Sequence, residues 1–332
     1  MWPTDLIPEE WRAPAARLAE SLRGLDRVIV AGHVNLDGDA LGSVAAVGWM
    51  LRALGREFVI YSRSGVPAYL DFLPLPGIMH DSLQRLPFRP GAAVLLDCGE
   101  PHRLGDELEK ALPGLASLNM DHHLGSAGMG SVDNWIEPEA AATAQLAAYV
   151  AICLDLELSG PLGEALALGL VTDTGGFAHG NTSAAVLHLA AHLVDKGCDI
   201  SLLRQRLDNG WSMGRMRLWA RLMQRLALEQ NGMLAFCAVR LDDLQECGAS
   251  KEDLEGFVEQ MRRLAGVRVA ALLREDAPGL CKFSLRSFGE TDVRAAAAAL
   301  GGGGHKNAAG GSLRMEIAAA AETLREAVRT AL

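Results

Sequence analysis

The sequence lacks the cysteine spacing of a zinc or redox motif, and this absence argues against a zinc-binding or disulfide-stabilised protein. Six cysteines occur among 332 residues, and no two of them form a C-x-x-C pair. Such usage is typical of reduced, buried thiols in a cytosolic protein rather than of a disulfide framework or a structural zinc site. We therefore expect a cytoplasmic protein in which thiolates do not bind a metal.

Long apolar runs, a secretory leader and an excess of positive charge are also missing. No apolar run reaches the roughly 18 residues that a membrane helix needs, and the early acids Asp5, Glu9 and Glu10 argue against a secretory signal. The formal net charge of −10 argues against binding to long duplex nucleic acid by phosphate neutralisation. We expect no membrane partner. The negative charge does not exclude binding of a short anionic ligand, and the sequence is compatible with a homodimer.

Length and periodicity predict an α/β protein of two domains. The chain is longer than one typical domain, and its 49% apolar and 22% charged residues are those of a globular protein. In the first part, the pattern predicts strands at 28–31, 58–61, 92–96 and 115–120 and helices at 2–24, 40–54, 140–154 and 162–171. Strands that alternate with helices in this way predict a mostly parallel sheet. Helical patterns at 182–196 and 212–228 follow. Strands at 234–239, 267–273 and 280–286 then alternate with helices at 251–264, 293–300 and 317–332. We predict a catalytic domain at 1–195, a helical linker at 196–229 and a smaller α/β domain at 230–332.

Acids and histidines follow the ends of several elements in the first domain. His33, Asp37 and Asp39 lie between the strand 28–31 and the helix 40–54. Asp39 is in the position of a helix N-cap, so capping is its simplest interpretation. Similar residues at three later ends are Asp97, Asp121, His122, His123 and Asp173. Each has a structural explanation alone, but parallel strands bring their carboxyl ends to one edge, where open α/β sheets bind ligands. Convergence there favours a metal site.

This ligand set is too large for one ion with open positions. Carboxylates and imidazoles without thiolates favour manganese or magnesium over structural zinc. The set suits two divalent cations roughly 3.5–4 Å apart, which would activate a water and clamp the oxygens of a displacement at phosphorus.

A glycine-rich run at 301–310 lies in the second domain. Four consecutive glycines are compatible with a flexible linker, but a linker needs neither His305 nor Lys306. Glycine amides can form an anion-binding nest, and Arg286 at a strand end can add a bidentate phosphate contact. We therefore predict phosphate binding by Gly302, Gly303, Gly304, His305 and Arg286.

The motifs HVNLDGDALGS, LLDCGE, DHH and VTDTGGF, in this order, resemble motifs I to IV of the DHH phosphoesterases. The later GGGGHKNAAG resembles the signature of the DHH-associated domain. Together they cover residues 25–313, and the sequence is most similar to the nanoRNase (oligoribonuclease) and pAp phosphatase branch. The resemblance implies an enzyme with two divalent cations, of which manganese is expected, with magnesium or cobalt as alternatives.

The resemblance also implies a role for each matching residue. One cation would be bound by His33, Asp37 and Asp97. The other would be bound by Asp39, Asp97, His122 and Asp173, with Asp97 bridging the two. Asp121 would orient the histidines, and His123 would contact the scissile phosphate and donate a proton to the leaving group. His305, the surrounding glycine amides and Arg286 would hold another phosphate of the substrate.

Two positions depart from the family pattern. Ala178 follows Phe177 where the family often has an arginine, and Phe288 follows Ser287 where a basic residue is usual. These departures concern the substrate, because every metal-ligand position is filled.

The expected activity is that of a manganese-dependent phosphodiesterase and 3′-nucleotidase. It would hydrolyse short single-stranded RNA to nucleoside monophosphates and 3′-phosphoadenosine 5′-phosphate (pAp) to AMP. One alternative is a phosphodiesterase for a cyclic dinucleotide or its linear product. The other is a nucleotide-binding module without catalysis, which we rank lower because no metal residue is missing.

Overall fold

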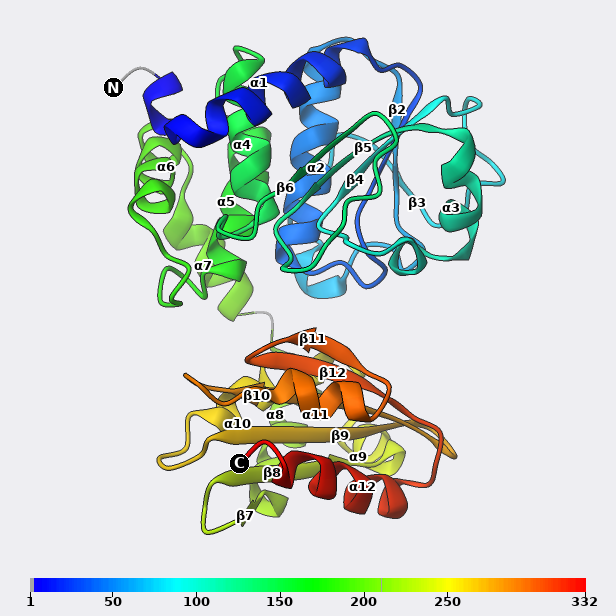
Figure 1. Ribbon diagram of the computed structural model, residues 1–332, viewed down its shortest axis with the longest axis vertical. Coiled ribbons are helices and arrows are strands. Elements are labelled where there is room, and N and C mark those ends of the chain that lie inside the picture. The colour runs from blue at the N-terminus through cyan, green and yellow to red at the C-terminus, as the bar shows by residue number, and fades with distance from the viewer. Residues whose placement is uncertain (1–2, 210) are drawn as a thin grey trace. The chain divides into compact units, whose positions relative to one another are not determined.

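The computed structural model describes residues 3–209 and 211–332, which form two compact units (Figure 1). Unit 1 ends at residue 210 and unit 2 begins at Trp211. This division lies inside the predicted linker 196–229, whose helices are divided between the units. The predicted α/β fold class is confirmed in both units, whereas the predicted domain bounds stay predictions.

A parallel six-stranded sheet with the order β3-β2-β1-β4-β5-β6 forms the centre of unit 1. Its strands are β1 Val28–Ala31, β2 Phe58–Tyr61, β3 Met79–His80, β4 Ala92–Leu96, β5 Ala116–Asp121 and β6 Asp133–Ile136. The first, second and fourth of these have the bounds that the sequence predicted. They are continuous apolar runs, as expected of strands that are buried on both faces.

Helices cover this sheet on both faces. The helices of unit 1 are α1 Glu9–Gly24, α2 Gly38–Ala53, α3 Asp106–Ala111, α4 Thr143–Cys153, α5 Gly160–Asp173, α6 Ala184–Asp195 and α7 Ile200–Asp208. Short 3₁₀ helices are Pro3–Leu6, Ala68–Leu70, Pro101–Leu104 and Leu112–Gly114. Along β1, Val28 and Val30 pack with α1, α2, α4 and α5, whereas Ile29 and Ala31 pack with α3. The alternation follows from the two-residue period of a strand.

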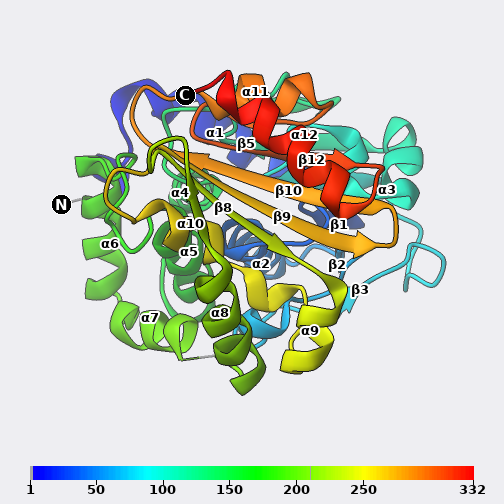
Figure 2. The same ribbon diagram turned by 90° about the horizontal axis from the view of Figure 1, so that it is seen from below.

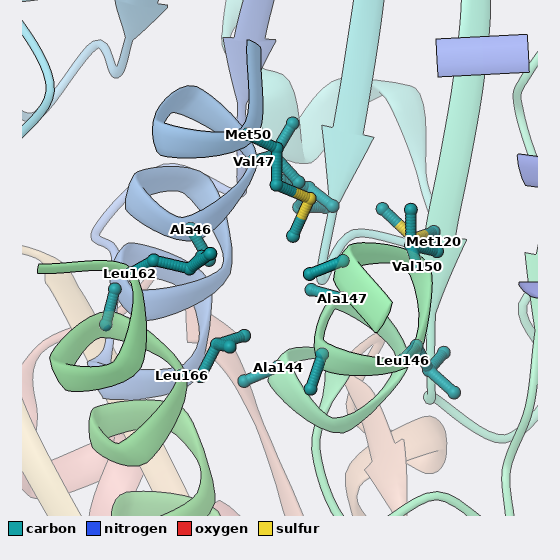
Figure 3. Close-up of a cluster of buried hydrophobic side chains, with 14 of the residues drawn as sticks. Ala46, Val47, Met50, Met120, Ala144, Leu146, Ala147, Val150, Leu162 and Leu166 are labelled. Carbon is teal, nitrogen blue, oxygen red and sulfur yellow. The ribbon is translucent and has the colours of Figure 1, made fainter. Parts of the chain in front are cut away.

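Helices α2, α4 and α5 are apolar on nearly all sides and pack closely behind the sheet (Figure 3). Figure 3 shows Ala46 and Met50 of α2 near Ala147 of α4 and Leu166 of α5. A Cβ added to Gly42 of α2 would lie 2.5 Å from the carbonyl oxygen of Ala165 in α5. The missing side chain therefore permits this close approach of the two helices.

Unit 2 contains a mixed six-stranded sheet with the order β11-β12-β10-β9-β8-β7. Only the β8–β9 pair is parallel in the described residues. The strands are β7 Ala227–Glu229, β8 Leu234–Val239, β9 Val269–Ala277, β10 Leu280–Ser287, β11 Gly303–His305 and β12 Ala308–Leu313. The helices are α8 Met213–Arg225, α9 Leu241–Cys247, α10 Phe257–Arg262, α11 Val293–Ala299 and α12 Ile317–Arg329, with a 3₁₀ turn at Glu252–Leu254. Helices α11 and α12 cover one face of the sheet, and α8, α9 and α10 cover the other (Figure 2).

Several predicted elements of unit 2 were wrong in detail. The single helix predicted at 251–264 is a 3₁₀ turn and α10, separated by Gly256 in the left-handed region at φ 79°. The helix predicted at 212–228 ends at Arg225, and β7 takes up its last residues. The sequence analysis also missed α9 and, in unit 1, β6, both of which are short. Such short elements carry too few residues for a period to be recognised.

Among the described residues, no helix has the combined length and apolar character that crossing a membrane requires.

Candidate metal centre

The candidate ligands gather where the strand order of unit 1 reverses. The chain proceeds outward from β1 to β3 and returns on the other side of β1 as β4. In such a sheet the crevice beyond the carboxyl ends of the two central strands is the usual ligand site. His33 follows β1, and Asp97 directly follows β4. The topology therefore places the first and second motifs side by side.

Asp37 is the N-cap of α2. Its Oδ1 accepts a hydrogen bond from the amide of Ala40 at 3.0 Å, and its Oδ2 lies 3.5 Å from Nε2 of His33. The prediction that Asp39 caps this helix is wrong, because Asp39 lies two residues after the N-cap, inside the first turn of α2. One oxygen of Asp37 shapes the loop and the other faces the candidate metal centre.

Asp39 caps a different helix. Its Oδ2 accepts from the amide of Thr143 at 2.6 Å, and its Oδ1 accepts from the amide of Ala144 at 2.9 Å. These amides belong to the first turn of α4 and have no partner inside that helix. A carboxylate is also favoured there by the helix dipole. Asp39 is thus held rigidly, with Oδ2 3.7 Å from Nε2 of His122.

Asp97 lies at the centre of the cluster. Its backbone has a φ of 54°, a left-handed conformation that is uncommon for a residue other than glycine. Its side chain is 3% exposed, with Oδ2 3.5 Å from Nε2 of His33 and Oδ1 3.5 Å from Nε2 of His122. The hydroxyl of Thr143 donates to Oδ1 at 3.1 Å. The strained backbone thus places one carboxylate between two imidazoles, and strain of this kind is concentrated at functional sites.

The tautomers of His33 and His122 follow from their backbone contacts. Nδ1 of His33 is 3.0 Å from the carbonyl oxygen of Val34, and Nδ1 of His122 is 3.2 Å from that of Ala140. A carbonyl only accepts hydrogen bonds, so Nδ1 must carry the proton in both rings. Both Nε2 atoms then face the carboxylates and can bind a cation.

His123 is oriented by Asp121. Nδ1 of His123 donates to Oδ1 of Asp121 at 2.7 Å, and Asp121 is fully buried. His122 is oriented instead by the carbonyl oxygen of Ala140. The side chain of His123 is 26% exposed, which is compatible with contact to a substrate.

Asp173 completes the cluster from the last turn of α5. Its Oδ2 is 3.1 Å from Nε2 of His122. The side-chain amide of Asn181 donates to the carbonyl oxygens of Asp173 at 3.2 Å and of Ala141 at 3.0 Å. The sequence analysis missed both Asn181 and Thr143, which position ligands without being ligands. Thr143 had no visible signal, because the helix was predicted to begin at residue 140 rather than at Thr143.

The structure therefore brings the candidate residues of unit 1 together in three overlapping groups. In each group the ligand atoms lie within 4.8 Å of one another. The groups are His33, Asp37 and Asp97; Asp39, His122 and Asp173; and Asp97, His122 and His123. Asp97 occurs in two of them, as a bridging carboxylate would. The first group is the set that the family resemblance implied for one cation.

The charges of the cluster favour a cation. Burial lowers the pKa of His33, but hydrogen bonds and charge from Asp37 and Asp97 outweigh it and raise that pKa to about 10. Burial opposes the charge on His122 too, yet its pKa rises to about 10 beside Asp173 and Asp39. Burial, followed by the charges of Asp97 and Asp173, raises the pKa of Asp39 well above its usual range. Carboxylates this close demand neutralisation by protons or by metal ions, so the residues fit a divalent metal centre.

The glycine-rich run of unit 2 is a β-hairpin rather than an irregular loop. Strand β11 pairs with β12, with His305 opposite Ala308. A Cβ on Gly302 would collide with the carbonyl oxygen of Gly310, and one on Gly304, at φ 135°, would lie 2.5 Å from that of Ala308. Close packing thus explains two of the glycines, while phosphate binding by this hairpin stays a prediction.

Arg286, the other predicted phosphate contact, lies near the end of β10. Its Nε donates to Oε1 of Glu259 at 2.7 Å. Its guanidinium therefore has a carboxylate partner, which a phosphate would have to displace or share.

Comparison with known proteins decides the family. The profile of the DHH family, N-terminal domain, matches residues 27–170, and that of the DHHA1 domain matches residues 234–332. The chain is 34% identical over 319 residues to the bifunctional oligoribonuclease and PAP phosphatase NrnA of Thermus thermophilus, covering 95% of this chain and 93% of that protein. This chain belongs to the DHH family. The family resemblance inferred from the sequence motifs is confirmed.

Two further comparisons agree with this assignment. The chain is 24% identical to the protein of the same description from Bacillus subtilis, over 87% of this chain and 90% of that protein. A crystal structure of an exopolyphosphatase-related protein from Bacteroides fragilis aligns with a TM-score of 0.87, covering 96% of each chain at 23% identity, which supports the fold alone.

As a DHH phosphoesterase, the chain belongs to enzymes that hydrolyse phosphoesters with divalent metals. The residues of unit 1 offer oxygen and imidazole ligands for such metals.

Proposed function

We propose that this protein is a two-cation phosphoesterase that hydrolyses short single-stranded RNA to nucleoside monophosphates and pAp to AMP. The main support for this proposal is the cluster of carboxylates and imidazoles around Asp97, at the point where the strand order of the sheet reverses. The substrates come from the 34% identity with the Thermus thermophilus enzyme, whose name states both activities. The comparisons give no such support to a cyclic-dinucleotide phosphodiesterase or to a non-catalytic module.

The proposed ligands divide between two sites. His33, Asp37 and Asp97 bind one cation, and Asp39, Asp97, His122 and Asp173 bind the other. The 3.5 Å distances from Asp97 to the Nε2 atoms of His33 and His122 support its bridging role. Two such cations, when bound, activate a water and stabilise the charge that develops on the phosphate. The absence of thiolates favours manganese, with magnesium or cobalt as alternatives.

His123 is the proposed proton donor to the leaving oxygen. Because Asp121 accepts the Nδ1 proton, the ring is held in a fixed orientation with Nε2 directed away from Asp121. A carboxylate orients a catalytic histidine in the same way. In unit 2, His305, Gly302, Gly303, Gly304 and Arg286 are proposed to bind a further phosphate of the substrate.

The test is hydrolysis of a 5′-phosphorylated RNA dinucleotide, a 20-residue RNA and pAp, each with Mn²⁺ and with chelator. We expect Mn²⁺-dependent release of monophosphates from the dinucleotide, conversion of pAp to AMP and little activity on the long RNA. Asp97→Asn should abolish turnover, whereas Asp71→Asn, an exposed carboxylate outside the cluster, should not. Equal activity on the long RNA, or full activity of Asp97→Asn, would contradict the proposal.

A further inference from the structure

Phe288 is a conspicuous residue that the proposed chemistry does not use. Its side chain is 75% exposed, more than that of any other described aromatic residue. It follows β10 directly and lies two residues beyond Arg286. The family resemblance leads one to expect a basic side chain near this position, so Phe288 changes what this corner of unit 2 can bind.

The residues on either side of Phe288 are clamped to the turn of the glycine hairpin by hydrogen bonds with Asn307. The side-chain amide of Asn307, at the turn between β11 and β12, donates to the hydroxyl oxygen of Ser287 at 2.8 Å and to the carbonyl oxygen of Gly289 at 3.1 Å. The amide of Ser287 donates to the carbonyl oxygen of Asn307 at 2.9 Å. The two residues that flank Phe288 are therefore bonded to the residue that follows His305 and Lys306.

An arginine lies over the same ring. The guanidinium carbon of Arg262 is 5.9 Å from the ring centroid of Phe288, and its Nη1 donates to the carbonyl oxygen of Ser287 at 3.1 Å. In the part of the chain that the structure describes, Arg262 forms no ion pair with a carboxylate. A planar apolar ring and a cation without a carboxylate partner are thus held together at the hairpin.

We infer that Phe288 is the stacking platform for the base of the nucleotide substrate, with Arg262 fixing the ring and adding positive charge. Exposed aromatic rings beside cationic groups are how proteins bind single-stranded bases without reading their sequence. A single exposed apolar residue also occurs on ordinary surfaces. The clamp by Asn307 and the cation over the ring distinguish this residue from such a case. The inference rests on the proposed function and names the part of unit 2 that recognises the base.

The experiment compares substrates with and without a base. Steady-state hydrolysis of pAp and of ribose 3,5-bisphosphate, which lacks the adenine, is measured for the wild type, Phe288→Ala and Phe288→Tyr. Because one stacked base contributes roughly five- to 150-fold in affinity, Phe288→Ala should raise KM for pAp about tenfold or more and leave kcat nearly unchanged. Its KM for the bisphosphate should stay that of the wild type, and Phe288→Tyr should retain the wild-type KM for both.

A matched control is Ile78→Ala, which removes an 81% exposed apolar side chain from unit 1 and should change neither KM. Circular dichroism and thermal unfolding establish that each variant is folded. The inference would be overturned if Phe288→Ala kept the wild-type KM for pAp, or if its KM rose equally for both substrates. If the wild type hydrolyses neither substrate, the proposed function fails, and calorimetric titration with AMP still decides whether the affinity of Phe288→Ala falls by the same factor.

Discussion

Replacing Thr143 by valine tests how the candidate metal centre is held in place. Thr143 is fully buried, and its hydroxyl donates to Oδ1 of Asp97 at 3.1 Å. Its backbone amide separately donates to Asp39, and a valine retains that amide and nearly the same shape. The substitution therefore removes one hydrogen bond to the proposed bridging carboxylate and little else.

The size of the effect can be estimated in two ways. A hydrogen bond to a charged group contributes about 1.5–3 kcal/mol. Loss of a group that orients a metal ligand typically costs about 10–100-fold in metal affinity, which corresponds to about 1.4–2.7 kcal/mol. The two estimates agree, so we expect Thr143→Val to raise the dissociation constant for Mn²⁺ by about 10–100-fold. Activity should return when Mn²⁺ is saturating.

The assay is calorimetric titration of Mn²⁺ into metal-free protein, together with activity as a function of Mn²⁺ concentration. Thr143→Ser retains the hydroxyl and should bind Mn²⁺ nearly as the wild type does. A wild-type dissociation constant for Thr143→Val would refute the reasoning. So would an equal loss in Thr143→Ser, because the effect would then come from packing rather than from the hydrogen bond.

Two further substitutions test packing and charge. Gly169→Ala should destabilise the protein by about 1–3 kcal/mol and weaken Mn²⁺ binding, because its Cβ would lie 2.5 Å from Oδ1 of Asp39. The control is Gly24→Ala, at a helical glycine with no neighbour within 4 Å, which should not destabilise the protein. Denaturant unfolding compares the two variants. Burial opposes ionisation of Asp243, but the amide of Arg240 and the guanidinium of Arg225 hold its pKa below the usual range. Because the folded-state pKa is the lower one, the stability that ionised Asp243 contributes is present above its unfolded-state pKa and is lost as pH falls through the folded-state pKa. The unfolding free energy of the wild type should thus exceed that of Asp243→Asn at pH 7 and converge with it in acid; a difference independent of pH would contradict this origin.

The sequence predicted well which side chains of unit 1 would lie together, because most of them lie in short motifs at strand ends. Parallel strands bring such ends together whatever the details of packing, so the positions of His33, Asp97 and Asp121 could be expected. The three strands with correct bounds are continuous apolar runs in the same sheet. Local pattern and tertiary placement agreed in these segments.

The prediction failed where a role depends on contact between distant segments. Asp39 was expected to cap its own helix, but it caps α4, which begins 104 residues later at Thr143. The sequence analysis placed no strand in the glycine-rich run at 301–310, because glycine has a low strand propensity and the pairing with β10 cannot be seen locally. Contacts of this kind are determined by the fold as a whole.

We propose that the cluster around Asp97 binds two divalent cations. The most direct measurement is the number of Mn²⁺ ions bound per chain, by equilibrium dialysis and elemental analysis of the metal-free protein reloaded with Mn²⁺. We expect two ions for the wild type and for Asp71→Asn, and fewer for Asp97→Asn with loss of RNA dinucleotide hydrolysis. Binding of two ions by Asp97→Asn, or of none by the wild type, would contradict it.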